Sequence, residues 1–460
     1  MNIFANILNS LKNLTLNSIG VQRDLLELIQ DRDISKAMNL FQNNDKEVIQ
    51  AICEYNPDTH DVMFRPDKLR KKKAPYKVQK LPRSWQRYIN EIALFFLLGN
   101  PIKWTNKTEE DTDLAFEAFK RFLEDTRFDT SMRQAKRLAG AETESAKLYH
   151  IYRDGNRPAV KVVVLSKSRG YTLRPLFDQY GNLIAFGYGY FLLEGGITYE
   201  HFDIETPDYI YSCKKENLGW TVKVKPNPTG KINVIYYPQP KEWEGSEQRI
   251  NRDEHVDSKT GDTNEYFADP IAAATVDVIK GMADPEAVGK LIQLQNGKES
   301  EFRYIEPPTS IEMKDSEKKV LKESILNDTL TPDFSYENMK GLGTLSGEAL
   351  KRAMIHGYIK RDNRKEIYEE LIDREKNLIL SIMKNITHIE MRDQLDKLNI
   401  KFEFSEPFNE DEEKRWEAIG KAVTDGIISL ETAVELLSIV DDPKEELIRI
   451  KREKEDTTVV

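Results

Sequence analysis

The chain has 460 residues, of which 39% are hydrophobic and 32% are charged, and its formal net charge at pH 7 is −10. Single hydrophobic cores stop growing near about 250–300 residues, so the length predicts more than one compact region. The 19 Tyr, 19 Phe and 5 Trp exclude a chain that is disordered throughout. The negative charge argues against a basic protein that coats nucleic acid.

Cysteine content and hydropathy indicate in which cellular compartment the protein is expected. Cys53 and Cys213 are the only cysteines, which excludes a disulfide framework or a cysteine zinc site and favours a reducing cytoplasm. The N-terminal sequence MNIFANILNSLKNL lacks the basic region and the cleavage site of a signal peptide. No apolar run approaches the ~20 residues of a membrane span, so we expect a protein without membrane contact.

The first part of the chain is predicted to be helical, with short helices within residues 1–60 and a strongly apolar helix over 85–98. Two further helices are expected at 113–127 and 130–150. Between these helical parts lies a basic stretch, residues 65–87, with ten Lys or Arg against a single acid. Such a stretch indicates either a solvated loop or a contact with nucleic acid or an acidic neighbour.

After residue 148 the spacing of apolar residues changes to two, which is typical of strands that pack on one face. Turn formers such as Asp154-Gly155 and Gly195-Gly196 separate the segments. The predicted strands are 148–153, 160–166, 171–177, 183–191, 198–202, 209–212, 220–225 and 232–237. Helices followed by neighbouring strands predict an α+β domain with a mostly antiparallel sheet.

Two polar helices are predicted next, at 244–267 and 314–327, with few apolar residues in either. A helix that is polar almost all round has no face to bury in its own domain. We therefore expect these helices to bridge, to face water or to pack against copies of themselves. A small block separates them, with an expected strand at 271–279, a helix at 285–294 and a strand at 301–306.

The C-terminal part begins with a glycine-containing segment, residues 331–347, in which Ser346 is a plausible helix N-cap. One long helix is predicted from there to residue 384, about 55 Å at 1.5 Å per residue. A strand at 400–404 and acidic helices within 410–455 complete the chain.

The motifs of common enzymes are absent. The sequence contains no GxxxxGK[ST], HExxH, CxxC or GxSxG, and its six histidines are scattered. Gly341-Leu342-Gly343 followed by Gly347 has the wrong spacing for a dinucleotide-binding loop. We therefore predict a protein that is not an enzyme and has no cofactor and no metal. Two alternatives stay open: a scaffold or adaptor without a DNA channel, and a DNA-processing enzyme within the α+β half.

Two stretches carry a family resemblance. The segment Ser-Gly-Glu-Ala-Leu at 346–350 enters a long helix, and the tail at 425–453 reads DGIISLETAVELLSIVDDPKEELIRIKRE. Together with the order of polar helix, αβ block and polar helix, they resemble the portal proteins of tailed double-stranded DNA bacteriophages of the long-tailed type. The similarity covers about residues 230–455.

The resemblance implies an α+β portal fold with a wing, a helical stem, a small αβ clip and a helical crown. The expected wing is 1–240, rejoined by the long helix and strand at 348–408. The other expected parts are stem helices at 241–267 and 309–330, a clip at 268–308, a tunnel loop at 331–347 and a crown at 409–460.

The function implied is that of a head-to-tail connector: a homo-oligomeric ring, typically of twelve subunits, at one capsid vertex. Double-stranded DNA would pass through it during packaging and ejection. Its expected partners are the terminase large subunit, a head-completion or adaptor protein, and the major capsid and scaffold proteins. Its expected location is the virion, after assembly in the host cytoplasm.

Site residues follow from the same resemblance. The DNA-facing loop would present Asn338, Lys340, Gly341 and Gly343. Partner contacts in the clip would involve Lys280, Lys290, Lys298 and Arg303. The single cation of the loop favours loose contact with DNA over tight binding. One residue departs from the expected pattern, since Gly261 inside the first stem helix costs about 1 kcal/mol relative to alanine.

Overall fold

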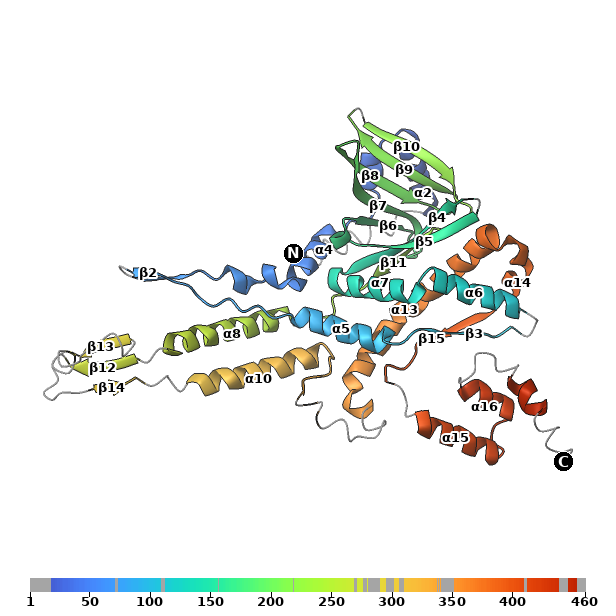
Figure 1. Ribbon diagram of the computed structural model, residues 1–460. Helices are drawn as coiled ribbons and strands as arrows, with labels where there is room; N and C mark the ends of the chain where they lie inside the picture. The colour runs from blue at the N-terminus through green and yellow to red at the C-terminus, as the bar shows by residue number, and fades with distance from the viewer. Residues whose placement is uncertain are drawn as a thin grey trace. The chain divides into compact units, whose positions relative to one another are not determined.

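The structure is a computed structural model. It describes residues 18–70, 73–108, 112–155, 157–217, 219–268, 271–275, 279, 290–294, 302–305, 310–336, 338, 340, 351–408, 412–437 and 446–452. The chain divides into two compact units (Figure 1). Unit 1 comprises Met1–Pro332 and His356–Phe404, and unit 2 comprises Asp333–Ile355 and Ser405–Val460.

Two antiparallel sheets form the centre of unit 1. The larger has the order β10-β9-β8-β7-β6 and the smaller β11-β4-β5. The strands of the larger sheet are β6 (Thr172–Phe177), β7 (Leu183–Glu194), β8 (Ile197–Glu205), β9 (Tyr209–Glu216) and β10 (Gly219–Pro226). Those of the smaller are β4 (Glu144–Asp154), β5 (Arg157–Leu165) and β11 (Val234–Pro238). The predicted α+β class with a mostly antiparallel sheet is confirmed.

Helices cover both outer faces of this sheet pair, because alternate residues of each strand point to opposite sides. One outer face carries α2 (Ser18–Gln30) and α3 (Ile34–Met38), and their apolar side chains pack on Phe202 and Ile204 of β8. Residues such as Leu148, Phe186 and Val234 fill the space between the sheets.

The other outer face carries the largest core. Its helices are α5 (Trp85–Leu98), α6 (Asp113–Asp125), α7 (Phe128–Glu142) and α13 (Ile355–Ile382). Two short strands, β3 (Lys103–Asn106) and β15 (Ile400–Glu403), pair antiparallel next to these helices. The predicted strand at 400–404 is therefore confirmed. Helix α4 (Asp45–Tyr55) lies against α5 and α7.

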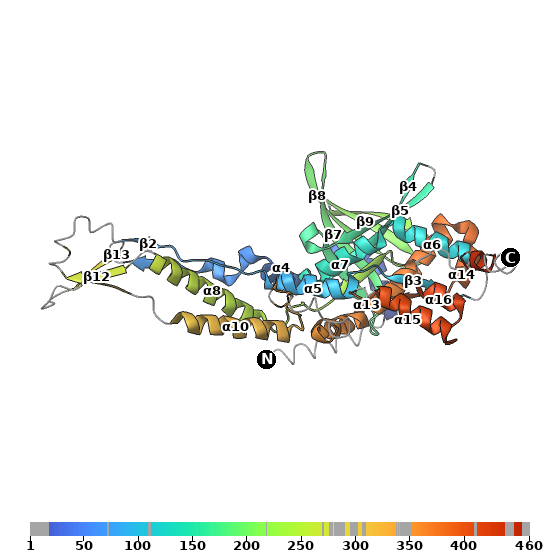
Figure 2. The ribbon, with the colours of Figure 1, turned by 60° about the horizontal axis from the view of Figure 1, so that its bottom comes forward.

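A hairpin of two helices extends from this core in unit 1, with α8 (Glu247–Ala268) antiparallel to α10 (Ser310–Asp328) (Figures 1 and 2). A three-stranded sheet follows α8 and precedes α10 in the chain: β12 (Ile271–Thr275), β13 (Lys290–Leu294) and β14 (Phe302–Tyr304). Strand β12 is central, parallel to β13 and antiparallel to β14.

Unit 2 contains two helices that pack on each other, α15 (Glu412–Thr424) and α16 (Leu430–Leu437). Ala433 and Val434 of α16 are buried. The helices predicted for the tail are confirmed over these ranges; α15 carries three acids and three bases, whereas α16 carries two acids and no base.

The structure corrects three predicted helices. The helix expected at 130–150 ends at Glu142, because Thr143 has φ +69° and residues from Glu144 onward join β4. Of the helix expected at 285–294, the described residues 290–294 form a strand instead. The long helix expected at 348–384 is interrupted by a turn at Met354, and α13 begins only at Ile355. Ser346, its predicted N-cap, lies outside the described residues.

Candidate functional site

Ion pairs, more than apolar contacts, join the two helices of the hairpin. Arg249 of α8 pairs with Asp328 of α10, and Arg252 pairs with Glu317 at 2.7 Å. Lys314 donates a hydrogen bond to Thr263 at 2.7 Å. Ile250 and Ile325 pack together at the end of the hairpin near α5, beside Ile89 and the fully buried Trp243. The hairpin is therefore hydrophilic along most of its length.

A second segment lies along α8 on the side away from α10 (Figures 1 and 2). We call residues 60–84 the arm; it includes the short strands β1 (Lys68–Arg70) and β2 (Lys73–Tyr76). Arg65 of the arm pairs with Asp262 of α8 at 2.8 Å, and both side chains are largely buried. The amide of Gln79 donates to the same carboxylate at 2.6 Å.

The arm makes further polar contacts with α8 closer to the N-terminus of that helix. The amide of Arg83 donates to Glu254 at 2.9 Å, and the Leu81 amide donates to Ser258 at 3.0 Å. His60 Nδ1 lies 2.6 Å from the same Glu254 carboxylate. Burial lowers the pKa of His60, but the hydrogen bond and charge of Glu254 outweigh it, so the pKa of His60 is raised.

These contacts change the interpretation of the polar helices. The prediction that such a helix has no face to bury in its own domain is wrong for α8. Its residues Asp253, Glu254, Ser258 and Asp262 are all buried. Hydrogen bonds and ion pairs from the arm compensate the cost of removing these polar groups from water. The same contacts show that part of the basic stretch at 65–87 binds acids of its own chain.

The structure also explains why a glycine, Gly261, stands in the interior of α8. A Cβ atom at this position would lie 3.2 Å from Cβ of Gln79 and 3.3 Å from Cδ1 of Leu81. The missing side chain therefore lets the arm approach the helix closely, which accounts for a glycine in a helix interior.

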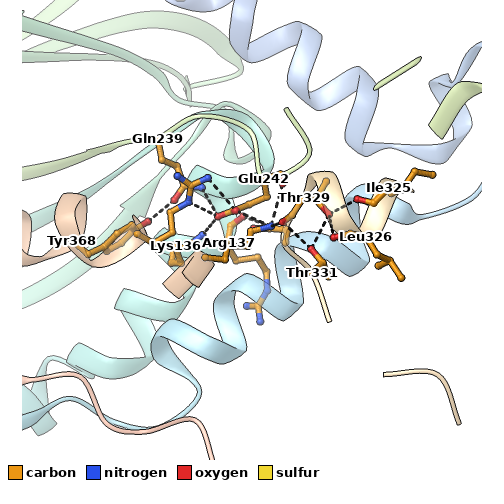
Figure 3. A network of polar contacts seen from close by, with 12 residues as sticks. Lys136, Arg137, Gln239, Glu242, Ile325, Leu326, Thr329, Thr331 and Tyr368 are labelled. Carbon is orange, nitrogen blue, oxygen red and sulfur yellow. Dashed lines mark hydrogen bonds and ion pairs between the residues drawn. The ribbon is translucent and has the colours of Figure 1, made fainter. Parts of the chain in front are cut away.

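A buried charge network joins the end of the hairpin to α7 and α13 (Figure 3). Glu242, whose side chain has no exposed area, pairs with Lys136 of α7 at 2.5 Å. From α13, Lys360 lies 3.3 Å from Glu242, and Arg364 donates two hydrogen bonds at 3.1 and 3.2 Å. Lys360 also donates to the carbonyl of Thr329, just after α10, at 3.0 Å.

The cations keep Glu242 ionised. Burial alone would raise the pKa of Glu242, but the charges of Lys136, Lys360 and Arg364 outweigh burial and hold it well below its ordinary value. Gln239 extends the network, donating to Glu242 at 3.1 Å and accepting from Tyr368 at 2.9 Å (Figure 3). The carboxylate thereby binds α7 and α13 directly, and Lys360 links it to the end of α10.

The predicted clip residues are only partly described. Lys290 lies on β13 opposite Ile271, and Arg303 lies on β14 opposite Ala273. They therefore flank the central strand β12 on its two sides. Phe302 and Tyr304, next to Arg303, are exposed and stack edge to face. Lys280 and Lys298 lie outside the described residues.

The predicted DNA-facing residues lie in unit 2. Asn338 and Lys340 are exposed and adopt a helical conformation, which differs from the expected loop. Lys340 Nζ lies 4.7 Å from the ring centre of Tyr336, one helical turn earlier. Gly341 and Gly343 lie outside the described residues.

Sequence reasoning missed the arm as a partner of α8. The sequence contains two features that point to this pairing: the acids of α8 recur at helical spacing, and the stretch 65–87 has an excess of cations. What the sequence lacks is the pairing of two segments that are almost 200 residues apart.

The described part of the chain gives no sign of metal or membrane chemistry. Within it, no three His, Cys, Asp or Glu side chains gather where they could hold a metal ion. None of its helices combines the length and the apolar character needed to cross a membrane.

Comparison with known proteins gives a family. The family model described as "Phage portal protein, SPP1 Gp6-like" matches residues 30–459. No curated protein matches the sequence. Among solved structures, a chain of the neck of a native GTA particle, computed with C12 symmetry, aligns with a TM-score of 0.45 and 10% identity. That alignment covers 90% of this chain and 99% of the other. Because the family model spans nearly the whole sequence, this chain belongs to the SPP1 Gp6-like family of phage portal proteins, structural head-to-tail connector proteins of the virion.

Proposed function

We propose that this portal protein assembles into a homo-oligomeric ring, of twelve subunits, whose axial channel carries double-stranded DNA during packaging and ejection. Within unit 1 the channel wall is built from the α8–α10 hairpin. The β12–β14 sheet, with Lys290 and Arg303, docks the terminase large subunit and later a head-completion or adaptor protein. The ring first assembles with scaffold and major capsid proteins in the host cytoplasm.

The observation that carries this proposal is the hydrophilic α8–α10 hairpin. Its helices contain eleven acids and seven bases; Asp253, Glu254 and Asp262 are buried, which leaves eight acids against seven bases and no excess of cations. Ion pairs also join the two helices to each other. Each phosphate that a protein neutralises adds affinity for DNA, so a hydrophilic surface without excess cations lets a duplex slide without being held. A hydrated channel wall needs this chemistry.

The DNA-proximal segment is proposed to include Asn338, Lys340, Gly341 and Gly343. Lys340 is exposed, and the cation next to Tyr336 offers one loose contact to phosphate. No nucleotide-binding motif occurs in the sequence, so the energy for packaging comes from ATP hydrolysis by the terminase.

Light scattering combined with negative-stain microscopy tests the assembly. Twelve copies of the 53.3-kDa chain give a ring of about 640 kDa, with a visible axial hole. A monomer or dimer in solution would contradict the proposal and favour an enzyme. Large particles without a hole would favour a scaffold or adaptor.

Lys340→Ala tests the channel segment. We expect the variant to form normal rings and to change the amount of DNA packaged or retained. Loss of ring assembly would place Lys340 in a subunit contact and contradict its assignment to the channel.

A further inference from the structure

The hairpin and the arm form three layers, with α8 between the arm and α10. On α8 the residues that bind the arm include Glu254, Ser258 and Asp262, whereas Arg249 and Thr263 bind α10. At about 100° per residue these two sets lie on roughly opposite faces of the helix. Figures 1 and 2 show the same order from two directions. Asp257 lies at the edge between these two faces, because its carboxylate pairs with Arg83 of the arm and with Lys318 of α10. The outer sides of the arm and of α10 in one copy nevertheless face away from each other.

The outer side of the arm is basic and partly apolar. Lys77 and Lys80 are exposed and form no ion pair with the described part of the chain. Phe64, near the start of the arm, is 72% exposed. The cations that face inward, Arg65 among them, are already paired with α8.

The outer side of α10 has the opposite charge. Glu312 and Glu323 are exposed and unpaired within the described residues, and Lys319 is the base that accompanies them on this side. Met313 is 76% exposed and Val320 is 58% exposed on the same side of the helix. A partner on this face would remove both apolar side chains from water, which is favourable.

We propose that the arm of one copy docks on the outer face of α10 of the next copy. This inference rests on the proposed ring. Two opposite sides of one layered unit, one basic and one acidic, match the head-to-tail interface that a cyclic assembly needs. The contact places Lys77 and Lys80 against Glu312 and Glu323. It also covers Phe64 of the arm and Met313 and Val320 of α10.

A cross-linking experiment tests the contact directly. Lys80→Cys and Glu323→Cys are combined in a chain whose exposed Cys53 is replaced by serine; Cys213 is buried. A disulfide needs Cα atoms within about 7 Å, and α8 separates the two positions inside one copy. Mild oxidation is expected to give a ladder of covalent multimers up to the full ring, which neither single variant gives.

Rings that form normally while the double-cysteine chain stays uncross-linked would overturn the interface and leave the proposed function standing. Absence of rings from the parent chain would instead overturn the proposed function. The two failures are thus distinguished in one experiment.

Charge reversal gives a second readout. The first double variant combines Lys77→Glu and Lys80→Glu, and the second combines Glu312→Lys and Glu323→Lys. Each is expected to raise the concentration at which rings dissociate by at least about tenfold. Combining both sets should recover much of the loss, because the charges are then exchanged across the contact. Lys223→Glu with Lys225→Glu, exposed on β10, is the matched control and should leave this concentration unchanged.

Two results would overturn the interface here. One is equal weakening by the control, which would mean that net charge alone governs assembly. The other is unchanged ring stability in the arm variant together with weaker binding of a double-stranded DNA fragment, which would assign the arm to DNA.

Discussion

Glu242 shows how neighbouring cations can stabilise a buried negative charge. A carboxylate without exposed area is surrounded by Lys136, Lys360 and Arg364, so its charge is more than balanced. Removing one partner of a buried ion pair is much more costly than removing an exposed pair, because the remaining charge stays desolvated.

The substitution Glu242→Gln is expected to lower the free energy of unfolding by about 3–5 kcal/mol, since three cations would lose their counter-charge. Denaturation by urea measures the loss. Glu91→Gln is the matched control: Glu91 pairs with Arg137 at 2.6 Å, both side chains are about 40% exposed, and the cost should stay within about 1 kcal/mol. Equal losses in the two variants would contradict the role given to Glu242.

Glu205 is also buried, but its pKa is raised, whereas the pKa of Glu242 is lowered. Burial, reinforced by the charge of Asp203, raises the pKa of Glu205 from an ordinary 4.5 to about 8. Between these values the unfolded chain has lost its proton while the folded protein keeps it. Stability therefore falls as the pH rises from about 4.5 to about 8 and levels off above.

Replacing Glu205 with Gln removes this titration and retains an oxygen that can accept from Asn233, now 3.3 Å from the carboxylate. We expect the variant and the parent to be similarly stable near pH 4, with the variant the more stable at pH 8. Unfolding curves across this range measure the difference. A gap that is constant with pH would show that Glu205 does not titrate as described.

At the scale of elements, the crossing of α13 and α5 depends on Gly357. A Cβ atom there would lie 2.3–2.5 Å from three ring atoms of Phe96, which is 1% exposed. The two helices can approach this closely only because Gly357 has no side chain.

Gly357→Ala is expected to lower the thermal midpoint of unfolding and to cost about 1–3 kcal/mol, because overpacking outweighs the helix preference of alanine. Phe96→Leu in the same chain should relieve the clash, so the double variant should be more stable than the sum of the single effects predicts. Simple additivity would mean that the ring moves aside without cost.

At the scale of the whole molecule, the large cores belong to unit 1. All residues of the core built on α5, α6, α7 and α13 lie at or before position 404. In unit 2, α15 and α16 contribute only Ala433 and Val434 to the buried apolar residues that the structure describes. A small core contributes little independent stability.

A chain ending at Phe404 is therefore expected to keep the main unfolding transition of the full-length protein. Calorimetry measures the midpoint, and circular dichroism reports the retained secondary structure. A shift of the midpoint by more than a few degrees, or loss of the cooperative transition, would show that residues 405–460 are needed for the fold of unit 1.

Much of the element order could be predicted from the sequence, because it depends on local spacing. Strands β6 to β10 follow from alternating apolar residues, and α5 follows from a continuous apolar stripe that ends at Gly99. The start of β4 was missed because Lys147 is polar but buried, paired with Glu375 on a distant helix. Local patterns carry no information about such a partner.

For the candidate site, too, some features could be predicted from the sequence and others could not. The hydrophilic character of α8 and α10, the absence of enzyme motifs and the resemblance in the tail are properties of the sequence by itself, and they determined the portal family. Only the tertiary structure decided that the acids of α8 are buried under the arm and that Glu242 holds α7, α13 and the end of α10 together. The physical reason is that periodicity reports which face of an element is polar, whereas the partner that satisfies a buried charge comes from a remote segment whose position only the fold establishes.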